Sequence, residues 1–226
     1  MDLPVRGLWL LPTRMRIEKL KRFFAVPPST PGVLLVQREE LAAMTSSYAS
    51  LDLPEGWKIL PTNSDGLADK CREVWPAVSK LDWIGLGCDD LRPQTVDWDK
   101  KLIAEITGKN IVTCDDGVQH DARMSGITVF SGGVLRAMGY MFPPHFWHTY
   151  VDNVWEDIGR GANCWTYVGD VLVEHDHPFR NQQLDPALAD ETTYKSYGQQ
   201  ARDVQAYQHW IATDKEAVIK RIKEMA

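Results

Sequence analysis

The feature that most constrains the fold is the alternation of short apolar runs with amphipathic stretches over residues 1–116. The apolar runs with the length and composition of strands lie at 7–11, 32–37, 57–62, 82–87 and 110–116. Stretches with apolar residues at helical spacing lie between them, at 16–26, 66–78 and 98–108. Strand–helix alternation predicts an α/β fold, a mostly parallel sheet with helices on both faces.

The composition is that of a globular protein with one domain, or one domain and a small appendage. The chain has 226 residues, of which 44% are hydrophobic and 25% are charged. The formal net charge of -6 argues against a sequence-independent nucleic-acid binder, because such a protein usually needs a basic face.

The cysteines and the N-terminal segment bear on location. Cys71, Cys88, Cys114 and Cys164 are far apart and form no Cys-x-x-Cys pair, which argues against a zinc knuckle and favours free thiols in a reducing compartment. The apolar run near the N-terminus is short and contains a proline, so we expect neither a membrane span nor a signal peptide. The expected location is the cytoplasm.

Polar residues follow several of the predicted strands. Asp89 and Asp90 follow the fourth strand, residues 12–14 follow the first, and residues 115 and 116 follow the fifth. In parallel sheets ligands bind beyond the carboxyl ends of the strands, so these residues are expected to share one ligand-binding edge.

Two patterns are candidates for a cation site. Adjacent carboxylates such as Asp89 and Asp90 are common in turns and helix caps, but carboxylate oxygens are also the ligands of Mg²⁺ and Mn²⁺. His175 and His177 end an apolar strand and point the same way, so both can reach one cation; a polar turn is the alternative interpretation.

Charged residues elsewhere have both a functional and an ordinary interpretation. Arg14 follows the first strand just before a helix, where a guanidinium is well placed for a phosphate, whereas Arg16 is interpreted as surface charge. Asp152 and Glu156 share a helical face, either as solvated acids or with a carboxylate that takes a proton from an acceptor hydroxyl.

Four motifs in order carry a resemblance to a known family. They are a strand followed by "PTR" and a helix, a strand ending in "GCDDLRPQTVDW", then "GYMFPPHFWHTYVDNVWEDIGR", and finally "VLVEHDHP". This order, over roughly residues 5–180, resembles GT-A-fold nucleotide-sugar glycosyltransferases of the family-2-like kind, in particular the short stand-alone versions of bacteria and phages. The resemblance implies a Rossmann-like nucleotide-binding sheet with a C-terminal helical tail.

The resemblance also implies donor-binding residues. Pro12, Thr13 and Arg14 would cradle the nucleotide, Asp89 would reach the ribose or the sugar, and Gln37 or Glu39 would read the base. The full set implied for the nucleotide-sugar is Pro12, Thr13, Arg14, Gln37, Asp65, Lys70, Asp89, Gly132 and Gly133. The expected donor is a UDP-sugar, because UDP is frequent in the family.

The metal and the catalytic base follow from the same resemblance. Asp90 would bind Mn²⁺ or Mg²⁺, with Cys88 at the position where relatives often carry the first aspartate, and His175 would complete the site with His177 as the alternative. Asp152 would be the base, although Asn153 stands where the family has a second acid. Transfer by a single displacement would invert the anomeric centre.

The expected domain organisation follows the motifs. Residues 1–185 form the catalytic domain, with a nucleotide-sugar-binding half at 1–116 and an acceptor and metal half at 117–185. Residues 186–226 are expected to form a helical appendage that packs on this domain.

Other functions stay open at this point. The acceptor can be a glycan, a protein, a small molecule or a hydroxymethylated base of phage-type DNA, which Trp147, Trp155 and Trp165 would stack. A hydrolase or nuclease built on the Asp-Asp and His-x-His residues is an alternative of another class, and a binding module without turnover is a further one. A nucleotidyltransferase is less favoured, since no glycine-rich loop with a lysine lies near the N-terminus.

Overall fold

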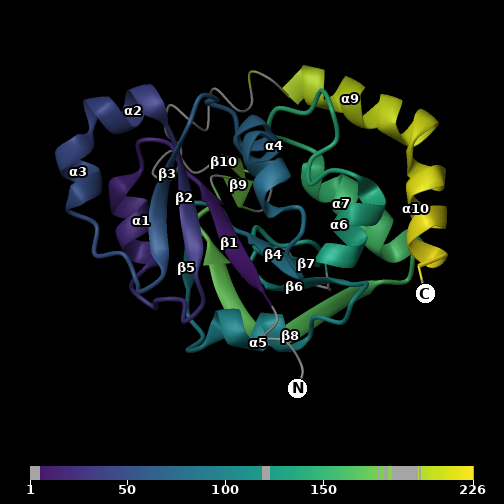
Figure 1. Cartoon of the computed structure of the whole chain (residues 1–226), viewed down its shortest axis with the longest axis horizontal. Helices are drawn as coiled ribbons and strands as arrows, with labels where there is room; N and C mark the ends of the chain where they lie inside the picture. The colour runs from purple at the N-terminus through teal and green to yellow at the C-terminus, as the bar shows by residue number, and fades with distance from the viewer. Residues whose placement is uncertain are drawn as a thin grey trace.

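A central sheet with helices on both sides makes up the molecule (Figure 1). The computed structural model describes residues 6–118, 123–177, 179–180, 183–184, 198 and 200–225. The expected boundary between the catalytic domain and the appendage, at 185/186, lies outside the described residues.

The secondary structure agrees closely with the predicted pattern. The strands are β1 (Gly7–Pro12), β2 (Gly32–Gln37), β3 (Trp57–Thr62), β4 (Trp83–Leu86), β5 (Leu91–Pro93), β6 (Ile111–Asp115), β7 (Thr128–Ser131), β8 (Trp165–His175), β9 (Phe179–Arg180) and β10 (Gln183–Leu184). The helices are α1 (Ile17–Phe23), α2 (Arg38–Ala43), α3 (Thr45–Ala49), α4 (Leu67–Val78), α5 (Trp98–Ala104), α6 (Gly132–Met138), α7 (Val151–Gly161), α9 (Gln200–Thr213) and α10 (Lys215–Lys223). The five predicted strands correspond to β1, β2, β3, β4 and β6.

The topology confirms an α/β fold with a mostly parallel sheet. Among the described residues, eight strands form one sheet in the order β3-β2-β1-β4-β7-β6-β8-β5. β7 runs antiparallel to both of its neighbours, and β5 runs antiparallel to β8. The other six strands therefore share one direction, which brings the carboxyl ends of β1, β4, β6 and β8 to one edge.

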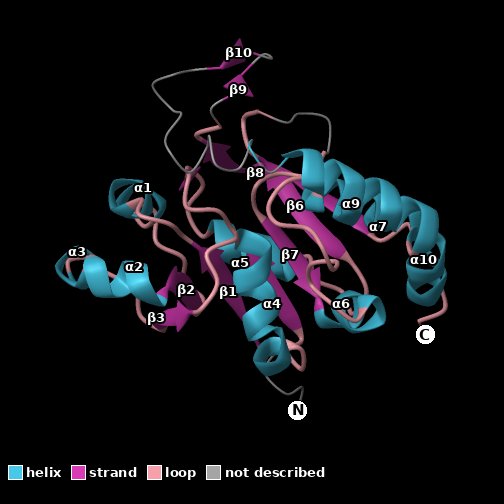
Figure 2. Cartoon of the chain, turned by 90° about the horizontal axis from the view of Figure 1, so that it is seen from above, coloured by secondary structure: helices cyan, strands magenta, loops and turns pink. Residues whose placement is uncertain are grey.

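The two faces of the sheet bury separate apolar clusters, because successive side chains of a strand point to opposite faces. On β1, Leu10 packs in the cluster that α4, α6, α7 and α10 cover. Its neighbours Trp9 and Leu11 pack in the other cluster, which α1 and α5 cover. Both faces are thus covered by helices, as Figure 2 shows from above.

Aromatic packing fixes the pairing of β1 with β4. Trp9 lies directly opposite Gly85 in the register, and a Cβ on Gly85 would approach the Trp9 ring to 2.2 Å. Trp9 also contacts Trp98, with the ring centroids 4.8 Å apart. A glycine is needed at this point of β4, and the close pairing sets the residues after β1 beside those after β4.

The C-terminal helices pack on the face that α6 and α7 cover (Figures 1 and 2). Trp210 of α9 is buried and its indole N–H donates to the Tyr140 hydroxyl at 3.0 Å. On α10, Val218 and Ile222 are buried in the same cluster. None of the helices in the described part of the chain has the length and apolar character needed to cross a membrane.

Candidate active site at the carboxyl edge of the sheet

A cavity of about 360 Å³ opens at the carboxyl edge of the parallel strands. Most of the residues predicted for the site line it, and they come from strand ends, loops and helices far apart in sequence. These lining residues are Pro12, Thr13, Arg14, Asp65, Lys70, Asp89, Asp90, Asp152, His175 and His177. The structure thus brings the four sequence motifs together at one place, while the role of each residue remains a prediction.

The loop after β1 is held by buried polar side chains. The Thr13 hydroxyl donates to Asp89 Oδ2 at 2.8 Å, and the Arg14 backbone N–H donates to the same oxygen at 3.1 Å. Met15 has a left-handed backbone with φ 52°, and its N–H donates to Glu40 Oε1 at 2.5 Å. A non-glycine residue in this region costs about 1–2 kcal/mol, so these contacts hold a strained turn at the cavity wall.

Two cationic side chains stand at this wall. Lys70 is buried, which lowers its pKa, and its ammonium donates to the Thr13 carbonyl at 2.5 Å. Arg14 Nη1 is 3.7 Å from Asp65 Oδ2 and makes no hydrogen bond within the described part of the chain. Lys70 therefore supports the loop, and Arg14 offers an unsatisfied guanidinium N–H to an anionic ligand.

The cation at the adjacent carboxylates is Arg16, which corrects its interpretation as surface charge. Its Nη1 lies 2.8 Å from Asp89 Oδ1 and 3.2 Å from Asp90 Oδ2. The Arg16 side chain is only 12% exposed; the residue is the N-cap of α1 and lines the cavity. One guanidinium thus bridges two like charges that would otherwise repel each other.

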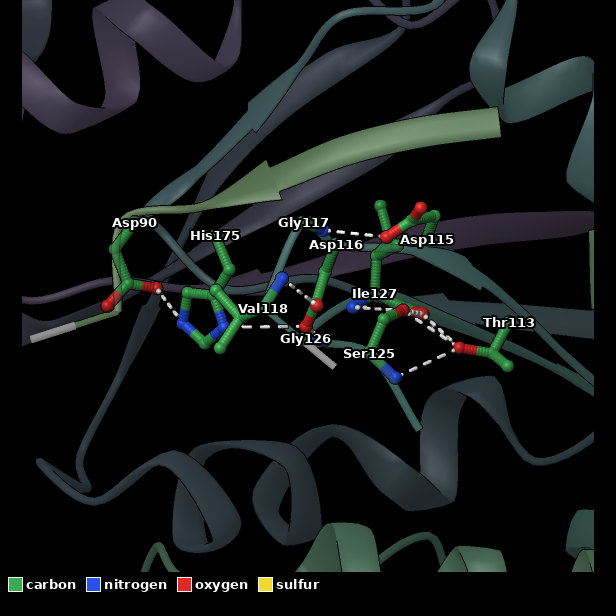
Figure 3. A network of polar contacts seen from close by, with 10 residues as sticks. All are labelled: Asp90, Thr113, Asp115, Asp116, Gly117, Val118, Ser125, Gly126, Ile127 and His175. Atoms are coloured by element: carbon green, nitrogen blue, oxygen red, sulfur yellow. Dashed lines mark hydrogen bonds and ion pairs between the residues drawn. The ribbon is translucent and has the colours of Figure 1, made fainter. Parts of the chain in front are cut away.

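Asp90 and His175 both line the cavity, and their side chains point toward each other (Figure 3). Asp90 Oδ1 is buried, accepts no hydrogen bond within the described residues, and lies 3.4 Å from His175 Nε2. On the other side of the imidazole, Nδ1 lies 3.8 Å from Asp116 Oδ2. Asp116 is itself held, since its Oδ1 accepts from the Val118 backbone N–H at 2.9 Å.

Asp90, His175 and Asp116 lie in a row, and their burial and their charges shift the pKa values of His175 and Asp90. Burial acts to lower the pKa of His175, but the carboxylates of Asp90 and Asp116 outweigh it and raise the pKa to about 9. Burial acts to raise the pKa of Asp90, but His175 and Arg16 outweigh it and hold the pKa below its usual range. These shifts favour the ionised form of Asp90 and the protonated form of His175 beside it.

These residues fit a divalent cation. The unbonded Asp90 oxygen and His175 Nε2 are 3.4 Å apart, and adjacent ligands of an octahedral Mg²⁺ or Mn²⁺ lie about 3 Å apart. In the described part of the chain, no group of three His, Cys, Asp or Glu residues is arranged to hold a metal alone. That agrees with Mg²⁺ sites of nucleotide enzymes, where one or two carboxylates act with substrate phosphates.

His177 lies beside this pair. Its ring centroid is 4.9 Å from that of His175, and the two rings are nearly perpendicular. Both imidazoles line the cavity, although β8 ends at His175 and His177 lies just beyond it.

The small residue at the cavity floor is Gly126, which was not among the residues predicted from the sequence. A Cβ there would lie 3.2 Å from His175 Nδ1 and 2.9 Å from a methyl carbon of Leu91. Gly126 and the preceding Ser125 line the cavity. The one signal in the sequence was a small-residue pair just before an apolar run, which is common in turns.

Gly132 and Gly133, expected under the donor sugar, lie at the opposite edge of the sheet. The reason is that β7 runs antiparallel to β4, so its end meets the beginning of β4. A Cβ on Gly132 would approach the Leu81 carbonyl oxygen to 2.0 Å. These glycines allow close backbone packing far from the cavity, and this part of the expectation is corrected.

The residues predicted to read the base, Gln37 or Glu39, lie at or just after the end of β2, which runs parallel to β1. Gln37 is half-buried at the end of β2 and Glu39 is exposed, and neither belongs to the described residues that line the cavity. The buried acid of this stretch is Glu40, which accepts hydrogen bonds from the Met15 backbone and the Tyr48 hydroxyl. β2 lies two strands away from β4, so its end is displaced along the edge.

The far wall of the cavity comes from the start of α7. Asp152 lies in the first turn of this helix, and burial raises the pKa of its carboxyl group. Glu156, one turn later, pairs with Arg160 at 2.7 Å and is not among the described residues that line the cavity. Asp152 is thus the carboxylate that the helix presents to the cavity.

Residues 147–149 complete this wall, and their backbone is hydrogen-bonded to a residue that is distant in the sequence. Trp147, His148 and Thr149 line the cavity, and their backbone N–H groups donate to Asp203 of α9. Burial lowers the pKa of His148, so its imidazole is neutral at physiological pH. Trp165 is not among the described residues that line the cavity; its ring contacts Arg160, with the guanidinium 5.9 Å from the ring centroid.

Comparison with known proteins shows the fold. No protein-family model matches the sequence, and no curated protein matches it. Among solved structures, the mannosyltransferase PcManGT from Pyrobaculum calidifontis in complex with GDP-Man and Mn²⁺ is similar, with a TM-score of 0.57 and 10% identity over 96% of this chain and 72% of that chain. The chain has the GT-A fold. TarS 1–349 from S. aureus in complex with UDP is similar too, with a TM-score of 0.53 and 12% identity over 74% of this chain and 59% of that chain.

The same fold also occurs in a protein named for another reaction. The 4-diphosphocytidyl-2C-methyl-D-erythritol synthase from Anaerococcus prevotii DSM 20548 has a TM-score of 0.51 and 9% identity over 87% of this chain and 96% of that chain. The fold is therefore compatible with more than one reaction of nucleotides, and the activity has to be argued from the site.

Proposed function

We propose that the protein transfers a sugar from a nucleoside-diphosphate sugar to an acceptor hydroxyl with the help of a divalent cation. The observation that carries the proposal is the close pair of Asp90 Oδ1 and His175 Nε2, 3.4 Å apart, in one cavity with Arg14 and Asp152. The GT-A fold and the ligands of the solved structures, GDP-Man with Mn²⁺ and UDP, support it.

The donor would bind on the side of β1 and β4. The loop of Pro12, Thr13 and Arg14 is fixed by Asp89, and the unsatisfied N–H of Arg14 is suited to a phosphate oxygen. Arg16 contacts Asp89 and Asp90 and offsets part of their negative charge, which would reduce their repulsion of an anionic diphosphate. UDP and GDP are the two nucleotides to test first, with UDP favoured by the family resemblance.

Asp90 and His175 would hold the cation, with His177 as the second imidazole at the same place. A divalent cation bound there would neutralise the charge of the diphosphate leaving group. Asp116 supports the arrangement, because a carboxylate behind a ligating imidazole fixes the orientation of the ring.

Asp152 would act as the base. Its raised pKa brings the carboxylate toward the range in which it takes a proton effectively, and such a base contributes about 10²–10⁴-fold. The acceptor oxygen forms a bond to the anomeric carbon while Asp152 takes its proton. The bond from that carbon to the diphosphate oxygen breaks, the nucleoside diphosphate leaves with the electron pair, and one displacement inverts the centre.

The acceptor is more consistent with a carbohydrate or small molecule than with a base flipped out of DNA. Trp147 and Trp155 are only 8% and 2% exposed, so they offer little open ring face for stacking. The net charge is -6, and DNA binding relies on neutralising phosphates with cationic side chains.

The test is the release of nucleoside diphosphate from a panel of UDP- and GDP-sugars with Mn²⁺, in the wild-type protein and Asp152→Asn. We expect at least one donor to be consumed, slowly with water alone and faster with an acceptor, and we expect the Asp152→Asn substitution to slow this consumption by about 10²–10⁴-fold. Failure of every donor to be consumed or bound with metal would contradict the proposal.

Nucleotidyl transfer is the second candidate, because the Anaerococcus prevotii synthase is matched over 96% of its length. In nucleotidyl transfer to a sugar phosphate, a phosphate oxygen attacks the α-phosphorus of a nucleoside triphosphate and pyrophosphate leaves. Pyrophosphate release from CTP or UTP with sugar phosphates, but no consumption of sugar nucleotides, would assign this activity instead.

A further inference from the structure

The C-terminal helix α9 carries a carboxylate that reaches the cavity wall. Asp203 has no solvent exposure. Its Oδ1 accepts the Trp147 N–H at 2.8 Å, and its Oδ2 accepts the His148 and Thr149 N–H groups at 2.9 and 2.7 Å. The Thr149 hydroxyl adds a fourth hydrogen bond to Oδ2 at 3.0 Å.

The buried carboxylate of Asp203 is satisfied only by the observed conformation of residues 147–149. Three successive backbone N–H groups that converge on one anion form a concave site for negative charge. A buried carboxylate is tolerated only when it is hydrogen-bonded. If residues 147–149 took another path, Asp203 would lose all four of these hydrogen bonds while still buried, so the loop and the helix stabilise each other.

The segment is constrained at both ends as well. His145 and Tyr150 have left-handed backbones, with φ 75° and 64°. Such conformations persist only where the surroundings fix them. On the carbonyl side, Arg72 of α4 donates to the Pro143 and Phe146 oxygens at 2.8 and 2.7 Å. Arg72 of α4 thus binds carbonyl oxygens of the segment, and Asp203 of α9 binds its N–H groups.

The held residues lead directly into the catalytic helix. Thr149 is followed by Tyr150, which is the N-cap of α7, and Asp152 lies in the first turn of that helix. Trp147, His148 and Thr149 all line the cavity. A shift of this segment therefore moves both the acceptor wall and the start of the helix that carries Asp152.

We infer that Asp203 is a positioning residue for the acceptor side of the active site, so that α9 is part of the catalytic apparatus. This inference rests on the proposed function for its kinetic consequences. The hydrogen bonds of Asp203 in the described part of the chain all go to residues 147–149, so the donor side is expected to be independent of it.

The chain offers a matched control for the attachment of α9. The Tyr207 hydroxyl donates to Asp157 Oδ2 on α7 at 2.8 Å, and its ring stacks on Tyr150 with centroids 5.6 Å apart. Tyr207→Phe removes this hydrogen bond between the helices but keeps the ring and all four bonds of Asp203. Asp203→Asn replaces one acceptor oxygen with an N–H₂ group that faces the backbone donors.

The experiment uses the full chain and two readouts. Hydrogen exchange at the amides of residues 147–149 is expected to be at least tenfold faster in Asp203→Asn than in the wild type, and unchanged in Tyr207→Phe. With a UDP- or GDP-sugar and water as the acceptor, Asp203→Asn is expected to lower kcat at least tenfold and to leave KM for the donor within twofold.

Each outcome decides a different point. Unchanged amide exchange in folded Asp203→Asn, or an equal loss of kcat in Tyr207→Phe, would overturn the inference. If Asp203→Asn does not fold, Thr149→Val removes only the hydroxyl bond to Asp203, and the same exchange and kcat effects are expected at smaller size; their absence would overturn it too. If no sugar nucleotide reacts with the wild type, the proposed function fails, while the exchange data still judge the role of Asp203 in holding the loop.

Discussion

The proposed donor side and the proposed acceptor side of the cavity are built in different ways. On the donor side, Thr13 and Asp89 lie just beyond the strands β1 and β4, and His175 is the last residue of β8. On the acceptor side, residues 147–149 owe their position to Asp203, which is 54 to 56 residues away in the sequence. The first side is fixed by the register of a parallel sheet, and the second by contacts between distant segments.

The difference implies that substitutions on the two sides separate nucleotide binding from turnover. Changes beside β4 and β8 are expected to weaken the binding of the donor with its metal. Changes at α7 and α9 are expected to slow the reaction and to leave the binding of the nucleotide nearly intact.

Asp90→Ala is expected to give the largest loss. It removes the carboxylate that pairs with His175, and loss of this proposed metal ligand would cost several kcal/mol, so donor consumption should fall by about 10⁴-fold. The measurement is nucleoside diphosphate release at saturating Mn²⁺. Activity within tenfold of the wild type would show that the donor side works without this carboxylate.

Asp152→Asn is expected to lower the rate by about 10²–10⁴-fold without weakening nucleotide binding. The rate of the wild type should fall as the pH drops through the pKa of Asp152, which burial raises, because the protonated carboxyl accepts no proton. A rate profile against pH, with UDP or GDP affinity measured in parallel, tests both parts. Loss of nucleotide affinity in Asp152→Asn would break the separation of the two sides.

The same carboxyl group has an expected effect on stability. Because the folded-state pKa of Asp152 is raised, folding disfavours its ionised form, and this cost is present above that pKa and is lost as the pH falls through it. Asp152→Asn should therefore be at least as stable as the wild type at about pH 8, with the advantage gone in acid. Thermal unfolding at several pH values measures this.

Arg16→Met is expected to destabilise the fold by about 3–5 kcal/mol, because it leaves two buried carboxylates without their shared cation. The matched control is Lys21→Met on the same helix, whose pair with Glu18 is exposed and whose loss should cost less than about 1 kcal/mol. Urea unfolding of both variants gives the comparison. Equal costs would mean that Arg16 is surface charge after all.

Cys88→Ala is expected to have the smallest effect. Burial raises the pKa of the Cys88 thiol well above its usual value, so it stays neutral and is a poor metal ligand. Activity should stay within about threefold of the wild type, since substitutions that remove no charge or hydrogen bond usually act weakly. A loss as large as that of Asp90→Ala would give the thiol a role on the donor side.

The sequence predicted well which strand ends meet at the proposed donor side, because strands and their ends leave a local signal. The apolar runs before Thr13 and Asp90 identified two strands, and the sheet brought His175 to the same edge. The direction of β7 left no such signal, since a short apolar run reads the same for a parallel and an antiparallel strand. Gly132 was therefore assigned to the wrong edge.

Two further residues were missed because their partners are distant. Arg16 looks like any charged residue at the start of a helix, and only the folded chain sets it against Asp89, which is 73 residues away in the sequence. Asp203 sits in a polar helical stretch, and its burial against the N–H groups of residues 147–149 depends wholly on tertiary packing. Local patterns do not record such contacts.

The most direct test of the account is calorimetric titration of UDP and GDP, with and without Mn²⁺, into the wild type and Asp90→Asn. We predict that Mn²⁺ strengthens the binding of one nucleotide to the wild type at least tenfold, or about 1.4 kcal/mol. We predict that Asp90→Asn loses this gain and keeps the metal-free affinity. An equal gain from Mn²⁺ in both proteins, or no binding of either nucleotide to the wild type, would contradict it.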